Sequence, residues 1–261
     1  MENLQISNWA RHVEYEIINT KGKDYIIPQK HVGASIYNPI NEEVNLLCDA
    51  LNLGKYLTEN ALGNKEQALD FVNKYGLLGI MTDITDSDLD QNEKLIIHEN
   101  IFTAQGVFST TEFSKLFFPV DDIDILVQPQ KPKIRLQSRK PIYTKMFLRT
   151  YRYAEPIEWL IKYFKYLYSF MECEKDKLCG FNAPHITYRI DTRTEPKLVC
   201  DYSSLKAVID LAFAKAVTDE KNPLRYCKHC GKVFYAKDSR SEFCSPKCRN
   251  QFNVYKSRAK R

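Results

Sequence analysis

The chain has 261 residues, of which 44% are hydrophobic and 27% are charged. That length allows one or two packed domains, and the composition excludes a fibrous or disordered protein. The first residues lack the basic head and apolar stretch of a secretory signal, and no apolar run reaches the roughly 18–20 residues of a membrane-spanning helix. We therefore expect a cytoplasmic protein.

The net charge of +5 is unevenly distributed. Residues 221–261 hold twelve Lys and Arg against two acids, Asp238 and Glu242, a balance of +10. The preceding 220 residues hold 26 basic and 31 acidic side chains, a balance of −5. This asymmetry points to a polyanionic partner, nucleic acid first, and the alternative of a solvated, solubilising tail stays equally open on charge alone.

The N-terminal part of the sequence begins with a strand-like pattern and then becomes helical. Apolar and acidic residues alternate within 13–27, on either side of a turn at 20–23, which predicts a β-hairpin. Asn38-Pro39 then predicts the start of a helix. The apolar residues of this helix, at helical spacing, are Val44, Leu47 and Leu51.

A second helix is expected from Asn64, with Gln67 as its capping-box partner, to Gly76. The acidic segment 83–93 lacks the glycine and distal glutamate of an EF-hand, so we expect a solvated loop. The basic segment 131–152 predicts an edge strand, and the alternative is an extension of a nucleic-acid surface.

Three further elements are expected before the cysteine-rich end. A helix from Pro156 to about Met171 has a continuous apolar stripe. Residues 186–190 and 197–200 predict a second hairpin. Ser203 or Ser204 then caps a helix, which ends before Asn222-Pro223.

Four of the eight cysteines fall in one short window with the spacing Cys-x2-Cys-x13-Cys-x3-Cys. Two close pairs of thiolates supply the four soft ligands that Zn²⁺ prefers, and four cysteines leave no position open for water. We therefore predict one structural Zn²⁺ and no catalytic residues. The predicted ligands are Cys227, Cys230, Cys244 and Cys248. The remaining cysteines are expected to be small buried or incidental side chains: Cys48, Cys173, Cys179 and Cys200.

The sequence around the ligands predicts a treble clef, which consists of a knuckle, a hairpin and a helix that carries the last ligands. Gly231 follows the first pair and permits the positive φ of a knuckle. Residues 233–235 are expected to form a strand, with Phe243 in the return strand. Ser245 and Pro246 are expected at the N-cap and first position of the helix. His229, between two ligands, is expected to be exposed.

The faces of this last helix suggest a role for the metal-bound segment. Cys248, Phe252, Tyr255 and Ala259 share one face, which is expected to turn inward. The other faces combine basic flanks with an amide-rich crest, a set suited to phosphate and base-edge contacts. The predicted nucleic-acid-binding residues are Lys247, Arg249, Asn250, Gln251, Asn253, Lys256, Arg258 and Lys260. The alternative is that the helix docks on the acidic part of its own chain.

These residues resemble the CGNR zinc-finger family, bacterial proteins in which a mixed α/β domain precedes a small finger. The resemblance rests on the two cysteine pairs, the CGKVF segment, Phe243 and the basic helix, and less specifically on 68–79 and the helix at Glu155-Pro156. The resemblance implies a DNA-binding transcription regulator. The sequence that names the family is Cys248-Arg249-Asn250-Gln251 here, so only its Cys and Asn are retained.

Together these patterns predict an α+β chain: a helix-rich domain with small β-hairpins over residues 1–220, and a treble-clef-like finger over 221–261. The first domain would sense a ligand or mediate assembly. DNA is expected as the partner before RNA, and no membrane is expected. Two alternatives stay open: a nuclease or other enzyme of a mobile-element or defence system, and a protein-interaction module. The chain lacks HExxH, Walker, GxSxG and GxGxxG motifs, so we do not expect an enzyme.

Overall fold

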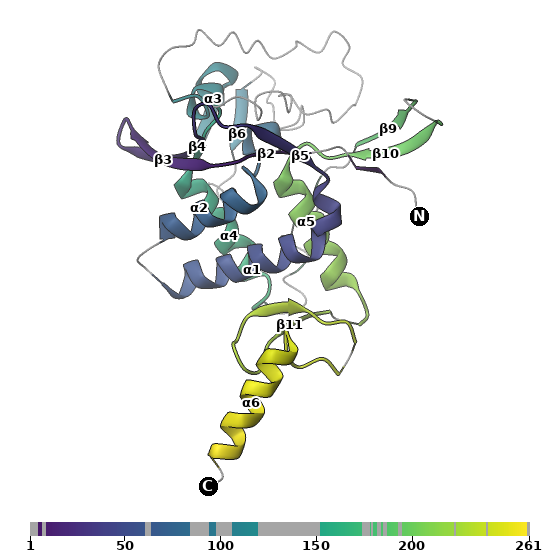
Figure 1. Ribbon diagram of the computed structural model, residues 1–261. Helices are drawn as coiled ribbons and strands as arrows, with labels where there is room; N and C mark the ends of the chain where they lie inside the picture. The colour runs from purple at the N-terminus through teal and green to yellow at the C-terminus, as the bar shows by residue number, and fades with distance from the viewer. Residues whose placement is uncertain are drawn as a thin grey trace.

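The computed structural model describes most of the chain, and the elements below lie within that part. The described residues are 5–6, 9–60, 64–83, 94–97, 106–119, 152–173, 178, 180–181, 184, 187–192, 195–221, 223–238 and 240–259. Helices and small sheets alternate along the chain, so the α+β prediction is confirmed (Figure 1). Among the described residues, no helix is both long and apolar enough to cross a membrane.

The helices and strands have the following bounds. The helical segments are η1 (Pro39–Glu42), α1 (Glu43–Glu59), α2 (Asn64–Tyr75), η2 (Ile80–Asp83), α3 (Thr110–Leu116), α4 (Ile157–Ser169), α5 (Leu205–Thr218) and α6 (Pro246–Arg258). The strands are β1 (Gln5–Ile6), β2 (Trp9–His12), β3 (Tyr15–Thr20), β4 (Lys23–Pro28), β5 (Ala34–Tyr37), β6 (Lys94–Ile97), β7 (Gly106–Ser109), β8 (Glu155–Pro156), β9 (Thr187–Asp191), β10 (Lys197–Asp201), β11 (Leu224–Tyr226) and β12 (Val233–Tyr235).

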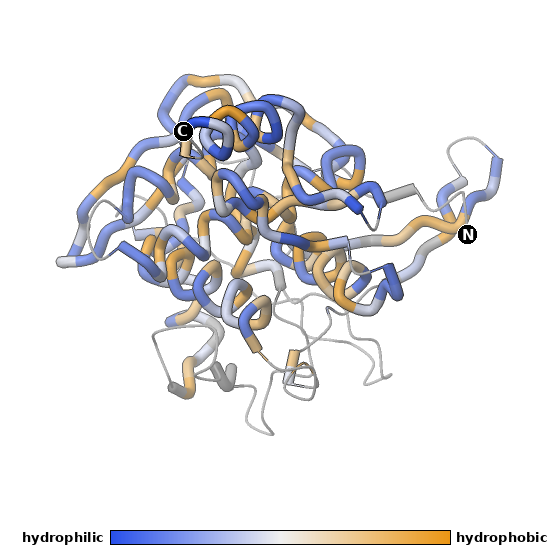
Figure 2. The backbone as a smooth tube through the Cα atoms, turned by 90° about the horizontal axis from the view of Figure 1, so that it is seen from below, coloured by the Kyte–Doolittle hydropathy of each residue, from blue (hydrophilic) through white to orange (hydrophobic). Residues whose placement is uncertain are grey.

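The core is a layer of helices in which α1 packs against α2, α4 and α5, with strands β2 to β5 above it (Figure 1). Helices α1 and α4 approach closely at Gly54, where a Cβ atom would lie 2.2 Å from the carbonyl oxygen of Phe164. Only glycine permits this approach, which brings α1 and α4 into contact along their length. The tube in Figure 2 shows hydrophobic stretches where these elements pack.

The predicted N-terminal hairpin is confirmed as β3 and β4, which pair from Tyr15↔Pro28 to Thr20↔Lys23. Lys21 and Gly22 both have positive φ, 52° and 76°, as a two-residue type I′ turn requires. Strand β8 adds to the free edge of β4. The second hairpin is confirmed as β9 and β10, which extend with β1 away from the helices (Figures 1 and 2).

The predicted helix boundaries are mostly confirmed. Asn38 caps η1, which leads into α1, and Ser204 caps α5 by accepting from the Ala207 N–H at 2.9 Å. Gly76, with φ of 90°, ends α2. However, Asn64 is the first helical residue and its Oδ1 accepts no hydrogen bond from the described chain, so the expected capping box with Gln67 is not formed.

Three expectations about the body need correction or lie outside the described residues. Helix α4 begins at Ile157 with Pro156 as its N-cap, because Pro156 still pairs with β4. Val44 is 46% exposed, so it is not part of the buried stripe of α1 that includes Leu47 and Leu51. The acidic loop, except Asp83, and the basic segment 131–152, except Arg152, lie outside the described residues.

A buried carboxylate connects two distant parts of the body. Glu155 has no exposed surface. Its Oε2 accepts from the backbone N–H of Leu78 at 2.8 Å, and its Oε1 accepts from Gly79 at 2.6 Å and Ile80 at 2.8 Å. The Tyr153 hydroxyl also donates to Oε1, at 2.8 Å. The backbone N–H groups of residues 78–80 thus find their acceptor in the Glu155 carboxylate and not in a neighbouring strand. These hydrogen bonds hold the segment against the start of α4.

Candidate metal centre and nucleic-acid interface

The structure brings the four predicted ligands together. The Sγ atoms of Cys227, Cys230, Cys244 and Cys248 all lie within 4.8 Å of one another. The Cys230–Cys244 separation is 3.7 Å and the Cys244–Cys248 separation is 3.4 Å. Four sulfurs at about 2.3 Å from a tetrahedral zinc would be about 3.8 Å apart. The cluster therefore has the dimensions of a four-thiolate metal site.

The first ligand pair lies in a knuckle that closes a short hairpin. The hairpin strands are β11 and β12, which pair from Leu224↔Tyr235 to Tyr226↔Val233. Within the knuckle, the Cys227 N–H donates to the Lys232 carbonyl and the Gly231 N–H donates to the Cys227 carbonyl, both at 2.9 Å. Gly231 has φ of 69°, as the sequence predicts.

The prediction for Phe243 is wrong. Strand β12 pairs with β11, which precedes the knuckle, and Phe243 belongs to no strand. The six-residue knuckle joins β11 to β12 directly, so the nearest strand in the sequence pairs with β12. The segment around Phe243 is therefore not its partner. Phe243 instead packs against a small apolar cluster formed by Cys227, Phe234 and Ala236.

The last ligand, Cys248, is held by the start of α6, as predicted, and Cys244 directly precedes the N-cap. The Ser245 hydroxyl accepts from the Cys248 N–H at 3.2 Å, and Pro246 follows at the first helical position. This cap places Cys248 in the first turn of the helix, beside the other three sulfurs. The Lys228 N–H also donates to the Glu242 carbonyl at 3.0 Å, which joins the knuckle to the segment before Cys244.

Two of the clustered thiols, Cys227 and Cys244, differ in acidity. Burial opposes ionisation of Cys227, but the backbone N–H groups of Cys230, Cys244 and His229 outweigh it and lower the pKa of Cys227 to about 6. Burial, followed by the neighbouring sulfurs, raises the pKa of Cys244 to about 12. Four negative sulfurs cannot share this space without a counter-charge, which a divalent cation would provide.

The prediction of an inward face along the whole of α6 is wrong beyond its second turn. Cys248 and Phe252 are half-buried, but Tyr255 is 58% exposed and Ala259 is also exposed. The four-cysteine segment is too small to cover a helix of this length, so α6 projects from it (Figure 1). Tyr255 stacks on His229, with ring centroids 5.7 Å apart.

His229 is half-buried, whereas the sequence predicts that it is exposed. Besides the stacking on Tyr255, its Nε2 lies 3.1 Å from Oε1 of Gln251. His229 thus fixes the first half of α6 to the knuckle. It does not belong to the ligand group of the described residues.

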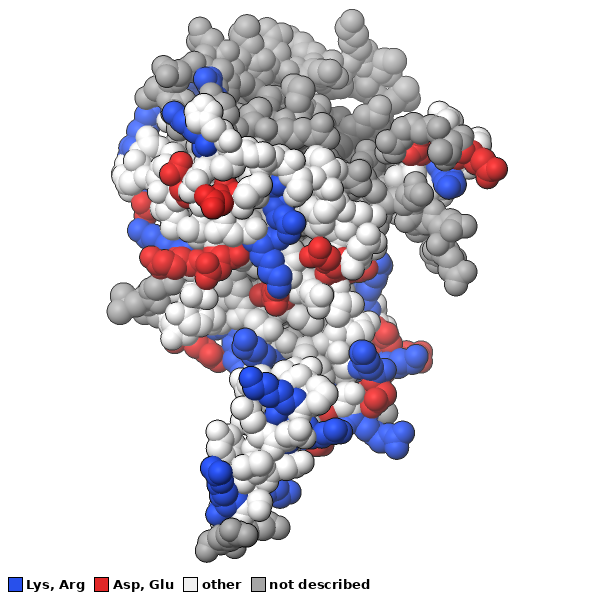
Figure 3. Space-filling model, in the orientation of Figure 1, with Lys and Arg blue, Asp and Glu red and all other residues white. Residues whose placement is uncertain are grey.

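The predicted nucleic-acid-binding side chains lie on this projecting helix. The described members of the set are all exposed: Lys247, Arg249, Asn250, Gln251, Asn253, Lys256 and Arg258. Lys260 lies outside the described residues. No acid occurs between Pro246 and Ala259, and Figure 3 shows Lys and Arg side chains along the helix. Because α6 points away from the helical layer, its described part does not dock on the described part of the body (Figures 1 and 3).

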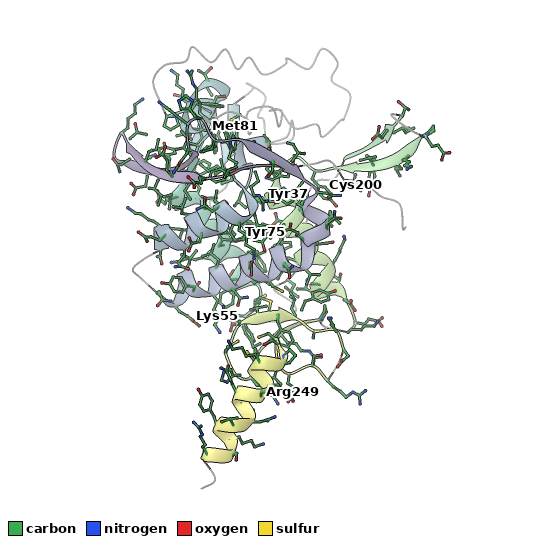
Figure 4. The ribbon with its side chains drawn as sticks, viewed as in Figure 1. Tyr37, Lys55, Tyr75, Met81, Cys200 and Arg249 are labelled. Atoms are coloured by element: carbon green, nitrogen blue, oxygen red, sulfur yellow. The ribbon has the colours of Figure 1, made fainter. Side chains whose placement is uncertain are left out.

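The sequence did not predict how the four-cysteine segment is attached to α1. Asn52 on α1 accepts from the Val233 N–H at 2.7 Å and donates to the Val233 carbonyl at 2.9 Å. Lys55, one turn later, donates to the Gly231 carbonyl at 2.7 Å (Figure 4). Leu224 and Val233 join the main core. These contacts span about 180 positions, so no local pattern could reveal them.

We expect that Asn52→Ala lowers both the free energy of unfolding and the metal affinity. The substitution leaves the N–H and carbonyl of Val233 without their partner, at a cost of about 1–3 kcal/mol. Because the finger is fixed to α1 through this contact, metal affinity should fall up to about tenfold. Urea unfolding and chelator competition would measure the two effects. Asn60→Ala, at the exposed C-cap of the same helix, is the control, and equal behaviour of the two variants would contradict the attachment.

Comparison of the chain with family models, with curated proteins and with solved structures finds no match. The resemblance to the CGNR family and the division at residue 220 therefore stay predictions. The metal-ligand geometry and the exposed basic helix are the observations on which a function can be argued.

Proposed function

We propose that the chain is a zinc-dependent nucleic-acid-binding protein in which one structural Zn²⁺ organises the finger and α6 makes the principal contact. The observation that carries this proposal is an exposed helix with cations and amides and no acid, which projects from a four-cysteine cluster. In line with the family resemblance, DNA is the preferred partner and regulation of transcription the preferred role.

Zinc is the metal that fits the ligands best. Four sulfur donors at tetrahedral spacing suit Zn²⁺, whereas magnesium, calcium and manganese prefer oxygen donors. With four protein ligands, the ion has no position left for a substrate or an activated water. Its role would be to fold the finger, and the proposal contains no catalytic step.

The shape and charge of α6 fit the major groove of a duplex. A helix with its side chains is about 10–12 Å across, and the groove is about 12 Å wide. Arg249 and Lys256 occupy one flank of α6 and Lys247 and Arg258 the other, at helical spacing. Such flanks can contact both phosphate strands, while Asn250 between them reaches base edges.

Fluorescence anisotropy of labelled duplex DNA and RNA, titrated with the zinc-loaded chain over a salt series, tests the proposal. We expect the logarithm of the affinity to fall linearly with the logarithm of the salt concentration. Lys256→Ala should reduce the slope by about 0.9, the loss of one phosphate contact. Lys30→Ala removes the same charge from the body and should leave the slope unchanged. Absence of binding at low salt would overturn the proposal and favour a protein partner.

A further inference from the structure

The finger contains a groove that neither the metal nor the exposed face of α6 accounts for. It lies between β12, the loop that follows β12 and the first turn of α6, and its volume is about 660 Å³. Pockets that bind small molecules have volumes of about 300–1,000 Å³. The lining residues used below are Tyr235, Lys237, Arg240, Phe243 and Arg249.

The groove has an excess of positive charge. Lys237, Arg240 and Arg249 are exposed, and none of them forms an ion pair with a described residue. The two acids of the lining already have partners. The Asp238 carboxylate accepts from the Arg240 N–H at 2.8 Å, and Glu242 forms an ion pair with Lys228. With Glu242 neutralised by Lys228, the three cations and Asp238 leave a balance of +2, which would offset the −2 charge that a zinc-bound set of four thiolates places behind the groove.

Aromatic side chains accompany these cations. Tyr235 and Phe243 both line the groove and are half-buried. Phe243 is held in place by Phe252 of α6, with ring centroids 5.2 Å apart. Cations beside aromatic rings in a concave site are the combination that binds unpaired nucleotides, because the phosphate contacts the cations and the base stacks on a ring.

The groove is continuous with one flank of α6. Arg249 lines the groove and also begins the flank that includes Lys256 (Figure 4). Lys247 and Arg258 lie on the other flank, and neither lines the groove. A strand that leaves the groove can therefore follow the Arg249 flank of the helix.

We propose that this groove binds one unpaired nucleotide of a single-stranded segment, with its phosphate at Lys237, Arg240 and Arg249 and its base against Tyr235 or Phe243. This inference rests on the proposed nucleic-acid function and deepens it. A blunt duplex keeps its bases paired and cannot fill the groove, so a duplex with a single-stranded extension is the better ligand.

The test compares anisotropy titrations of a blunt DNA duplex and of the same duplex with a short single-stranded extension, each with the full zinc-loaded chain. We expect the extended duplex to bind about tenfold tighter, within the range of one stacked base. The double variant Lys237→Ala/Arg240→Ala should remove most of this preference. Lys247→Ala/Arg258→Ala, which also removes two charges, should weaken both ligands and keep their ratio. Zinc content of one per chain shows that each variant is folded at the metal.

Equal binding of the two ligands by the natural sequence would overturn the groove proposal and leave the proposed function intact. A preference that survives Lys237→Ala/Arg240→Ala would overturn it as well, because the extension would then bind elsewhere. Failure of both ligands to bind would contradict the nucleic-acid function itself, and the groove proposal with it.

Discussion

Serine in place of Cys244 is expected to abolish tight metal binding and to unfold the finger. Cys244 lies within 3.7 Å of two other ligand sulfurs, so its thiolate is central to the cluster. The apolar cluster beside the four sulfurs is small: Cys227, Phe234 and Ala236 are buried, and Phe243 and Cys248 pack against them. The metal must therefore supply most of the folding free energy, about 10–16 kcal/mol for structural zinc in finger peptides.

Two measurements would show this effect. Native mass spectrometry should find one zinc per natural chain and none on the Cys244→Ser chain. Amide hydrogen exchange should become fast in α6 and in the knuckle, while α1 and α4 stay protected. Cys173→Ser is the matched control, because Cys173 lies outside the cluster and its thiol donates only to the Phe170 carbonyl, which serine can also do. Full zinc content in the Cys244→Ser chain would refute the assignment of the ligands.

Alanine in place of Glu155 is expected to produce the largest loss of stability in the body. The substitution leaves the backbone N–H groups of Leu78, Gly79 and Ile80 buried without their acceptor. Each unsatisfied group costs about 1–3 kcal/mol, so the loss of three partners should lower the free energy of unfolding by at least about 3 kcal/mol. A whole domain has only about 5–15 kcal/mol, which makes this a severe loss.

Urea unfolding of the zinc-loaded chain, followed by circular dichroism, would measure the change. Glu158→Ala is the control, since Glu158 is exposed in the first turn of α4 and its loss should cost no more than about 1 kcal/mol. Glu155→Gln should fall between the two, because an amide nitrogen in place of Oε2 would oppose the Leu78 N–H. Equal midpoints for Glu155→Ala and Glu158→Ala would contradict the role given to Glu155.

Local signals in the sequence predicted much of the candidate site. The cysteine spacing, Gly231 and Ser245-Pro246 each act within a few residues, and each occupies the predicted place. The same holds for the turn at Lys21-Gly22 and for the cap at Ser204. These features could be read from the sequence because the chemistry that fixes them is short in range.

Other features depend on contacts that no local pattern contains. Which surfaces meet after folding decides three of them: the strand partner of β12, the exposure of Tyr255 and the hydrogen bonds between Asn52 and Val233. The burial of Glu155 is of the same kind, because three of its four donors lie in residues 78–80, more than seventy positions away along the chain.

One local signal was overlooked. The Ser109 hydroxyl accepts from the Glu112 N–H at 3.2 Å, and the Glu112 carboxylate accepts from the Ser109 N–H at 2.9 Å. This capping box starts α3, within a stretch of sequence that lacks a clear hydrophobic period. The Ser-x-x-Glu spacing was sufficient to predict the helix.

The central claim is that a metal-organised finger binds nucleic acid, and one titration tests it most directly. Labelled duplex DNA is titrated with the full chain as purified, after removal of the metal by a chelator, and after addition of one equivalent of zinc. We expect binding to be lost with the metal and restored by zinc, because α6 is fixed to the knuckle only while the four cysteines are held together. Affinity that is unchanged by metal removal would contradict the claim.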